Sequence, residues 1–262
     1  MRDVYRYGRE VNSHDLMKVM AIATMVVDHV GVNFTDENVW LRVVGRMAAP
    51  LFFFLVGYSG SYRFKPKLLY YWLVLVVVIY VTRAGESTVD RILPLNILLS
   101  FTLIKLLLNR FDAARLTSEG LIIGLSTMMV FSLPTYLLTE YGTLGLCYAI
   151  GARLLSKRRK FAKLWISATV GVHFVFELTF LLILNEKVST QLLPFAIPLL
   201  ALVFAVNLII FLNYNFRAFK IGPKYLRALI IYVSRYSLEV YVFHLSAFMI
   251  VHYVWHPTVS LW

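Results

Sequence analysis

Apolar runs of about 15–20 residues recur along the whole chain, and they limit its fold more than any other feature. A run of this length, wound as an α-helix with a rise of about 1.5 Å per residue, is close to the length needed to cross a hydrocarbon core of about 30 Å. We expect nine such spans, at 16–34, 41–60, 68–82, 93–108, 120–135, 143–155, 164–184, 192–212 and 228–256. The sequence therefore predicts an all-α fold, a polytopic transmembrane helical bundle.

The composition supports an integral membrane protein. Of the 262 residues, 60% are hydrophobic and only 15% are charged, whereas soluble domains are about 25% charged. The chain has one cysteine, Cys147, which excludes an intrachain disulfide. We expect residues 1–262 to form a single domain, in which residues 1–15 are a polar tail inside the cell or at the membrane interface.

Lysine and arginine predict how the bundle is oriented. The amino-terminal tail and every second loop hold 18 of these residues, and the loops between them hold 3. Because loops rich in lysine and arginine stay inside the cell, we expect the amino terminus inside and the carboxyl terminus outside. The net charge of +12 then reflects topology and contact with membrane lipids, and nucleic acid is not an expected partner.

Several ionisable residues lie within the predicted spans, where a charge costs several kcal/mol unless it faces the interior and finds a partner. Asp28, His29, Arg46, Glu177 and His244 come from four spans, yet all fall at middle-to-outer depth. We interpret this common depth as one polar cavity inside the bundle.

Other ionisable residues of the spans have simpler explanations. Lys18 and Arg153 lie near inner span ends, where long side chains extend to the headgroups, and we expect Arg42 at the outer headgroups. His173 is expected to be a hydrogen-bonded core histidine, and His252 to lie in an aromatic belt at the outer interface.

Arg235 and Glu239 lie four residues apart in the last span, so they are either a structural ion pair or part of a site. A metal site is not expected, because there is no HExxH pair or cysteine cluster, and His173 with Glu177 alone is a weak ligand set.

Two segments resemble the TraX family of bacterial membrane proteins, named for the conjugative-plasmid protein that acetylates the amino terminus of F pilin. They are DLMKVMAIATMVVDHVG (15–31) and LRVVGRMAAPLFFFLVGY (41–58). The family pattern has an early Lys, then Met-x-x-Asp-His-x-Gly, then Leu-Arg-x-x-Gly-Arg-x-x-x-Pro. The matching residues are Lys18, Met25, Asp28, His29, Gly31, Leu41, Arg42, Gly45, Arg46 and Pro50.

A third segment, YSLEVYVFHL (236–245), is similar to the terminal element of the wider integral-membrane acyltransferase superfamily. In that superfamily ten residues separate a basic residue from a histidine. Lys18 and His29 have this spacing, with Lys where Arg is usual.

The resemblance implies an enzyme that transfers an acetyl group from acetyl-CoA at the outer face of the bacterial inner membrane. The pilin-modifying branch favours the amino terminus of a pilin as acceptor, and a hydroxyl of a cell-surface glycan is the alternative. His29 is the expected general base, and Asp28, Glu177 or Glu239 would assist or orient it. Arg46 would stabilise charge or anchor a carboxylate, and His244 is the second candidate base or donor.

Inner basic residues are expected to bind the phosphates of coenzyme A. The expected residues that bind the coenzyme or substrate are Lys18, Arg42, Arg63, Lys65, Arg153, Arg158, Arg159 and Arg235, together with Glu177, Glu239 and His173. Two other classes remain open at this point. One is a proton-coupled transporter that uses Asp28, His29 and Glu177 as a relay, and the other is an inactive scaffold.

Overall fold

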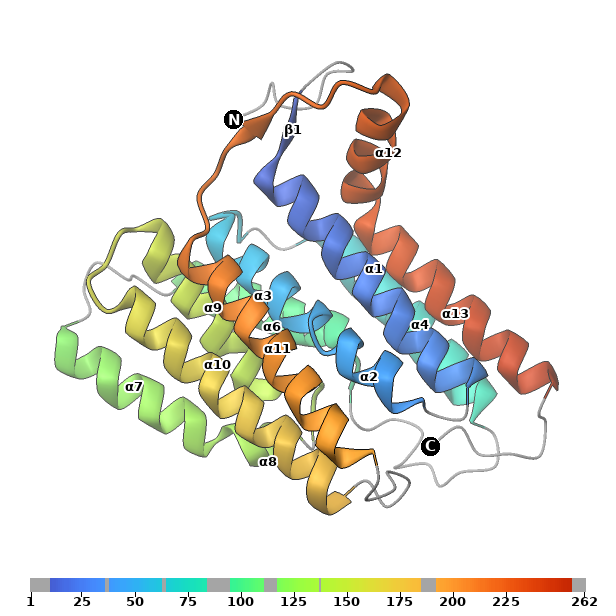
Figure 1. The fold of residues 1–262 in the computed structure, drawn as a ribbon, viewed down its shortest axis with the longest axis horizontal. Helices are drawn as coiled ribbons and strands as arrows, with labels where there is room; N and C mark the ends of the chain where they lie inside the picture. Colours follow the sequence, from blue (N-terminus) through green and yellow to red (C-terminus); the bar gives the residue numbers. More distant parts are fainter. Residues whose placement is uncertain are drawn as a thin grey trace.

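Each of the nine apolar ranges contains α-helix in the computed structural model of the chain (Figure 1). The structure describes residues 10–35, 38–62, 65–83, 95–110, 117–136, 138–184 and 192–255. The helices are α1 (Ser13–Phe34), α2 (Val39–Gly45), α3 (Ala48–Tyr58), α4 (Pro66–Thr82), α6 (Ile97–Arg110), α7 (Ser118–Val130), α8 (Ser132–Tyr136), α9 (Gly142–Ser156), α10 (Ala162–Thr179), α11 (Leu193–Leu212), α12 (Lys224–Arg235) and α13 (Ser237–Trp255). A π-helical turn, η1 (Phe180–Leu184), follows α10, and strands β1 (Val11–Asn12) and β2 (Ala218–Phe219) pair antiparallel. The predicted all-α class is confirmed.

Four described segments are long and apolar enough to cross a membrane: Val39–Tyr58, Ala162–Leu182, Leu193–Leu212 and Ser237–Trp255. Two shorter helices, Pro66–Thr82 and Ser118–Val130, are also apolar. Large apolar side chains cover their outer faces, which water would solvate poorly and lipid solvates well. The chain is a multi-pass membrane protein.

The predicted span 41–60 is divided into two helices. α2 ends at Gly45 and α3 begins at Ala48, so Arg46 lies at the turn between them. Pro50 is the physical reason, because proline has no N–H to donate to the carbonyl of Arg46 four residues earlier, and its ring crowds that carbonyl.

The predicted span 228–256 is also divided, at Tyr236. Lys18 Nζ on α1 lies 3.4 Å from the carbonyl oxygen of Ser234, in the last turn of α12, and the Ser234 hydroxyl donates to Asp15 at 2.6 Å. These contacts fasten the end of α12 to α1. Arg235 and Glu239 therefore do not share one continuous helix, contrary to the expected spacing.

The start of α1 overlaps the last residues of the predicted polar tail, 1–15. α1 begins at Ser13, where Asn12 and Asp15 form a capping box: each side chain accepts a hydrogen bond from the backbone N–H of the other. Residues 1–9 lie outside the described residues.

The tightest helix contact lies between α3 and α9. A Cβ on Gly57 would meet the carbonyl oxygen of Ala149 at 1.9 Å, so only glycine permits this approach. Phe53 and Phe54 of α3 are fully buried and pack in the core. This core holds α2 and α3 in place beside α1, and α1 in turn lies along α13 (Figure 1).

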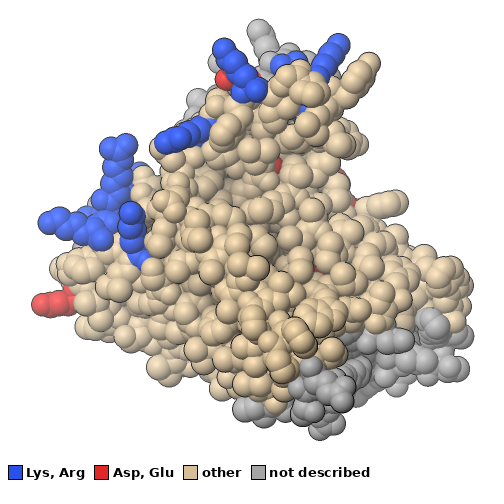
Figure 2. Space-filling model, in the orientation of Figure 1, with Lys and Arg blue, Asp and Glu red and all other residues tan. Residues whose placement is uncertain are grey.

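Cationic side chains gather at one end of the bundle. Figure 2 shows Lys and Arg around β1, β2 and α12 at the top of the view and near the α9–α10 turn at the upper left. The exposed cations of these regions are Lys157, Arg158, Lys160, Lys163, Arg217, Lys220, Lys224 and Arg235.

Candidate active site

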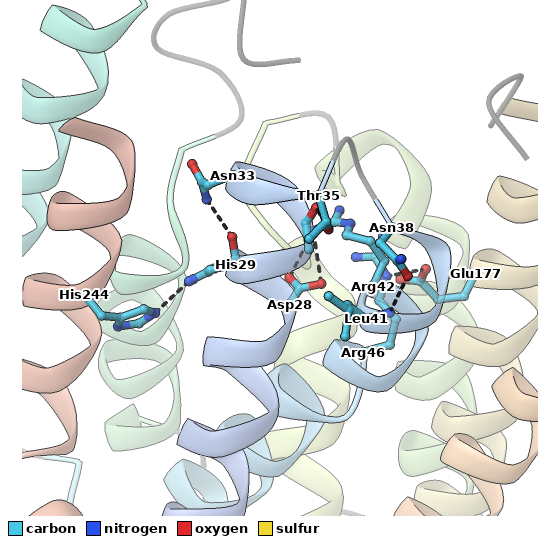
Figure 3. Close-up of polar contacts among 11 residues, drawn as sticks. Asp28, His29, Asn33, Thr35, Asn38, Leu41, Arg42, Arg46, Glu177 and His244 are labelled. Atoms are coloured by element: carbon cyan, nitrogen blue, oxygen red, sulfur yellow. Dashed lines mark hydrogen bonds and ion pairs between the residues drawn. The ribbon is translucent and has the colours of Figure 1, made fainter. Parts of the chain in front are cut away.

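Asp28 and His29 are neighbours on α1, and they face different helices. Successive residues of an α-helix point about 100° apart, so His29 is directed toward α13 and Asp28 toward α2 (Figure 3). The two side chains therefore belong to different polar contacts, and Asp28 does not orient His29.

His29 pairs with a second histidine. Its Nδ1 lies 2.8 Å from Nε2 of His244 on α13, and the two rings meet edge to edge, with centroids 5.0 Å apart and planes inclined by 20°. Nδ1 of His244 lies 2.6 Å from the carbonyl oxygen of Val240, one turn earlier on the same helix. His244 is buried, with 9% of its surface exposed, and His29 is half-buried. The predicted participation of Glu177 or Glu239 in orienting His29 is wrong, because His244 has that position.

Asp28 pairs with Arg42 of α2. Nη1 of Arg42 donates to both carboxylate oxygens, at 3.0 and 3.1 Å. Gly45 makes this approach possible, since a Cβ there would lie 2.2 Å from Cβ of Asp28. The expected location of Arg42 at the outer headgroups is therefore wrong: its guanidinium is held inside the bundle, with 24% of the side chain exposed.

Arg46 leads into a third polar contact. Its Nε lies 3.0 Å from Glu177 of α10, whose other oxygen lies 3.4 Å from Nε2 of His173. Nδ1 of His173 is 3.0 Å from the hydroxyl of Tyr148 on α9. His173 is 1% exposed, in agreement with the expected core histidine.

The three contacts lie side by side at one level of the bundle, as Figure 3 shows. They are arranged from α13 through α1 and α2 to α10. In place of the single cavity expected from their depth, the structure has three adjacent pairs of side chains. In two of these pairs a carboxylate neutralises an arginine. A contact between two histidines carries no fixed charge and leaves a ring nitrogen for proton transfer.

Among the described residues of the predicted coenzyme-binding set, Lys18, Arg153, Arg158 and Arg235 lie toward the end of the bundle where α1 begins. Arg153 stacks on Tyr62, with its guanidinium carbon 4.4 Å from the ring centroid, and Arg158 is exposed at the α9–α10 turn. Burial raises the pKa of Tyr62, against the opposing charge of Arg153. Its phenol therefore keeps the proton that it donates to the carbonyl of Gly57 at 2.5 Å.

A second basic group surrounds the α12–α13 break. Lys18 and Arg235 lie there, and Glu239 pairs with Lys67 of α4. Arg63 lies outside the described residues. Within the described chain, no three His, Cys, Asp or Glu side chains come together as metal ligands would.

Some partners were not predicted. One of them, the Val240 carbonyl that contacts His244, could have been predicted from helical spacing alone, because Val240 lies four residues before His244. Tyr148 and Lys67 lie 25 and 172 residues from their partners, and no local pattern indicates such contacts. Nδ1 of His252 lies 2.7 Å from the carbonyl of Asn33, near the end of α1, a contact that spacing along the chain does not indicate either.

Comparison with known proteins assigns the chain to a family. It is similar to the uncharacterized protein RP591 of Rickettsia prowazekii (strain Madrid E), with 32% identity over 68 residues. That stretch is 26% of this chain and 27% of the relative, so the match spans about a quarter of each protein. No solved structure matches. The family described as TraX protein matches residues 13–194, which include α1, α2, α9 and α10 and hence most of the site. The chain therefore belongs to the TraX protein family.

Proposed function

We propose that this protein is an acetyltransferase of the bacterial inner membrane that moves an acetyl group from acetyl-CoA to the amino terminus of a pilin. Membership of the TraX family supports an acetylation role. The observation that carries the proposal is the state of His29. His29 is half-buried, and its hydrogen-bond partner is another histidine, His244. The nearby carboxylates of Asp28 and Glu177 are paired with arginines and not with His29.

His29 is the general base of the proposed reaction. The acceptor nitrogen attacks the thioester carbonyl carbon, and His29 takes the proton as the C–N bond forms. Negative charge develops on the carbonyl oxygen, and the terminal amino groups of Arg46 would stabilise it while Nε remains with Glu177. The C–S bond then breaks, and the proton passes from the imidazolium to the departing thiolate.

The proposed reaction requires the coenzyme to reach from one face of the membrane toward the other. We propose nine spans with the amino terminus in the cytoplasm, so that the basic residues Lys18, Arg153, Arg158 and Arg235 meet the phosphates of the coenzyme there. Lys18 and His29 are eleven residues apart on α1, which is about 16 Å along the helix axis. A coenzyme whose phosphates lie near Lys18 would thus extend its pantetheine arm along α1 toward His29.

Arg42 and Asp28 have a structural role in this scheme. Their mutual contact fixes α2 against α1 and so positions Arg46 at the α2–α3 turn. The pairings also argue against a transporter, because the carboxylates of the supposed relay, Asp28 and Glu177, are each paired with an arginine, whereas His29 is paired with His244.

The test is an assay of purified protein with acetyl-CoA and a peptide copy of a pilin amino terminus. Release of thiol and the mass of the peptide are followed together for the wild type, His29→Ala and the control His252→Asn. His252 lies on the same helix as His244, and asparagine keeps a donor for the carbonyl of Asn33.

We expect acetylated peptide from the wild type and the control and none from His29→Ala. Thiol release with an unmodified peptide would move the proposal to a glycan hydroxyl. No thiol release from wild-type protein, in an assay where an active TraX relative releases thiol, would refute the acetyltransferase.

A further inference from the structure

We infer that His244 is a positioning residue, which places the hydrogen of His29 on Nδ1 and leaves the lone pair of Nε2 to accept the proton of the acceptor. This inference deepens the proposed function and rests on it. It concerns which of the two ring nitrogens of His29 is the base, and which residue decides this.

The argument starts at a backbone carbonyl. Nδ1 of His244 lies 2.6 Å from the oxygen of Val240, and a carbonyl oxygen only accepts hydrogen bonds. Nδ1 of His244 must therefore carry a hydrogen. A neutral imidazole has one N–H, so Nε2 of His244 has the lone pair and acts as an acceptor.

The second step passes from His244 to His29. Their contact joins Nε2 of His244 to Nδ1 of His29 at 2.8 Å. Since Nε2 of His244 accepts, Nδ1 of His29 must donate and carry the hydrogen. The remaining nitrogen of His29, Nε2, then has the lone pair, and a general base requires such a lone pair.

The assignment reverses only if His244 is an imidazolium, which would donate through both nitrogens. The surroundings of His244 favour the neutral ring. It is buried, and it packs against Tyr241 and Phe248, with ring centroids 6.0 and 5.5 Å away. The carboxylates that would balance a positive ring have other partners: Asp28 is held by Arg42, Glu177 by Arg46 and Glu239 by Lys67.

The helix itself keeps this arrangement in place. Val240 and His244 are four residues apart within α13, so the carbonyl oxygen of Val240 stays one turn away from the His244 ring for as long as the helix is intact. Rotation of the His29 ring would break its 2.8 Å contact with His244, so this contact also restrains the ring. An isolated imidazole in water exchanges freely between its tautomers, whereas this pair selects one.

Two substitutions separate the hydrogen-bonding role of His244 from its packing role. His244→Phe keeps an aromatic ring beside His29 but removes the nitrogen that accepts its hydrogen bond. His244→Gln removes the ring but supplies an amide oxygen that can accept from Nδ1 of His29. Both variants and the wild type are assayed for kcat and KM with acetyl-CoA and the peptide. Protein labelled with 15N in histidine is examined by NMR, with the His29 signals identified by their loss in His29→Ala.

We expect the wild type to show a protonated Nδ1 and an unprotonated Nε2 at His29. In His244→Phe, kcat falls by about 10²-fold, within the range attributed to general base catalysis, while the KM for acetyl-CoA changes little. His244→Gln recovers a substantial part of kcat and the wild-type tautomer. A merely structural role predicts the opposite ranking, because phenylalanine preserves the packing better than glutamine.

A wild-type His29 with its hydrogen on Nε2 would overturn the inference, as would a His244→Phe variant at least as active as His244→Gln. If the phenylalanine variant does not fold, the wild-type NMR signals and the glutamine variant still decide the question. The two proposals fail separately. Loss of the proposed function appears as an inactive wild type, whereas failure of this inference appears as an active, His29-dependent enzyme with the opposite tautomer.

Discussion

Replacing Gly45 with alanine tests whether the close approach of α2 to α1 builds the site. The new Cβ would lie 2.2 Å from Cβ of Asp28, and ordinary contact begins at 3.4 Å. Because the Cβ of Asp28 is fixed to the backbone, rotation of its side chain cannot relieve the clash, and the helices must separate by about 1.2 Å. The contacts of Arg42 with Asp28, now 3.0 and 3.1 Å, would then exceed hydrogen-bond distance.

We expect the variant to lose about 2–3 kcal/mol of stability, since overpacking costs about 1–3 kcal/mol and the ion pair is weakened as well. At about 2–4 °C per kcal/mol, the melting temperature in detergent falls by roughly 5–10 °C. Acetyl transfer should fall with it, because Arg46 follows Gly45 directly. The matched control is Gly171→Ala in α10, where a Cβ meets no described atom within 4 Å. Equal melting temperatures for wild type, Gly45→Ala and the control would refute this account of the α1–α2 contact.

Three further results are expected. Glu177→Gln leaves the half-buried guanidinium of Arg46 without a counter-charge and should lower the free energy of unfolding by about 3 kcal/mol. The double variant Arg46→Met/Glu177→Leu should melt nearer to the wild type but stay inactive. A double variant with the lowest melting temperature of the three proteins would contradict the pairing. Tyr148→Phe removes the hydroxyl contact of His173 and should cost about 1 kcal/mol in chemical unfolding, and an unchanged unfolding midpoint would mean that the contact adds nothing. Burial raises the pKa of Glu140, in the α8–α9 loop, from 4.5 to about 7. The unfolded chain therefore releases this proton at lower pH than the folded chain, and stability falls as the pH rises from about 4.5 to 7. Glu140→Gln should flatten the dependence of melting temperature on pH over that window, and an unaltered slope would exclude Glu140 as the cause of the dependence.

Much of the helical layout could be predicted because it depends on local properties. In a hydrocarbon environment each backbone N–H and C=O must be satisfied within its own segment, so a long apolar run becomes a helix whatever its neighbours are. Even the α2–α3 break follows from a single residue, Pro50. The α12–α13 break does not, because it depends on the contacts of Ser234 with Lys18 and Asp15, which are more than 200 residues away in the chain.

The amino-acid sequence by itself determined that the chain is a helical membrane protein, that its cations are concentrated at alternate loops, and that His29 and Arg46 lie in a TraX-like pattern. Only the tertiary structure decided the partners of the polar residues. Asp28 and His29 are adjacent in the sequence, yet one pairs with Arg42 and the other with His244, 215 residues away. The physical reason is that hydropathy sets where a helix lies along the membrane normal, whereas its rotation and neighbours are set by packing at contacts such as Gly45 on Asp28 and Gly57 on Ala149.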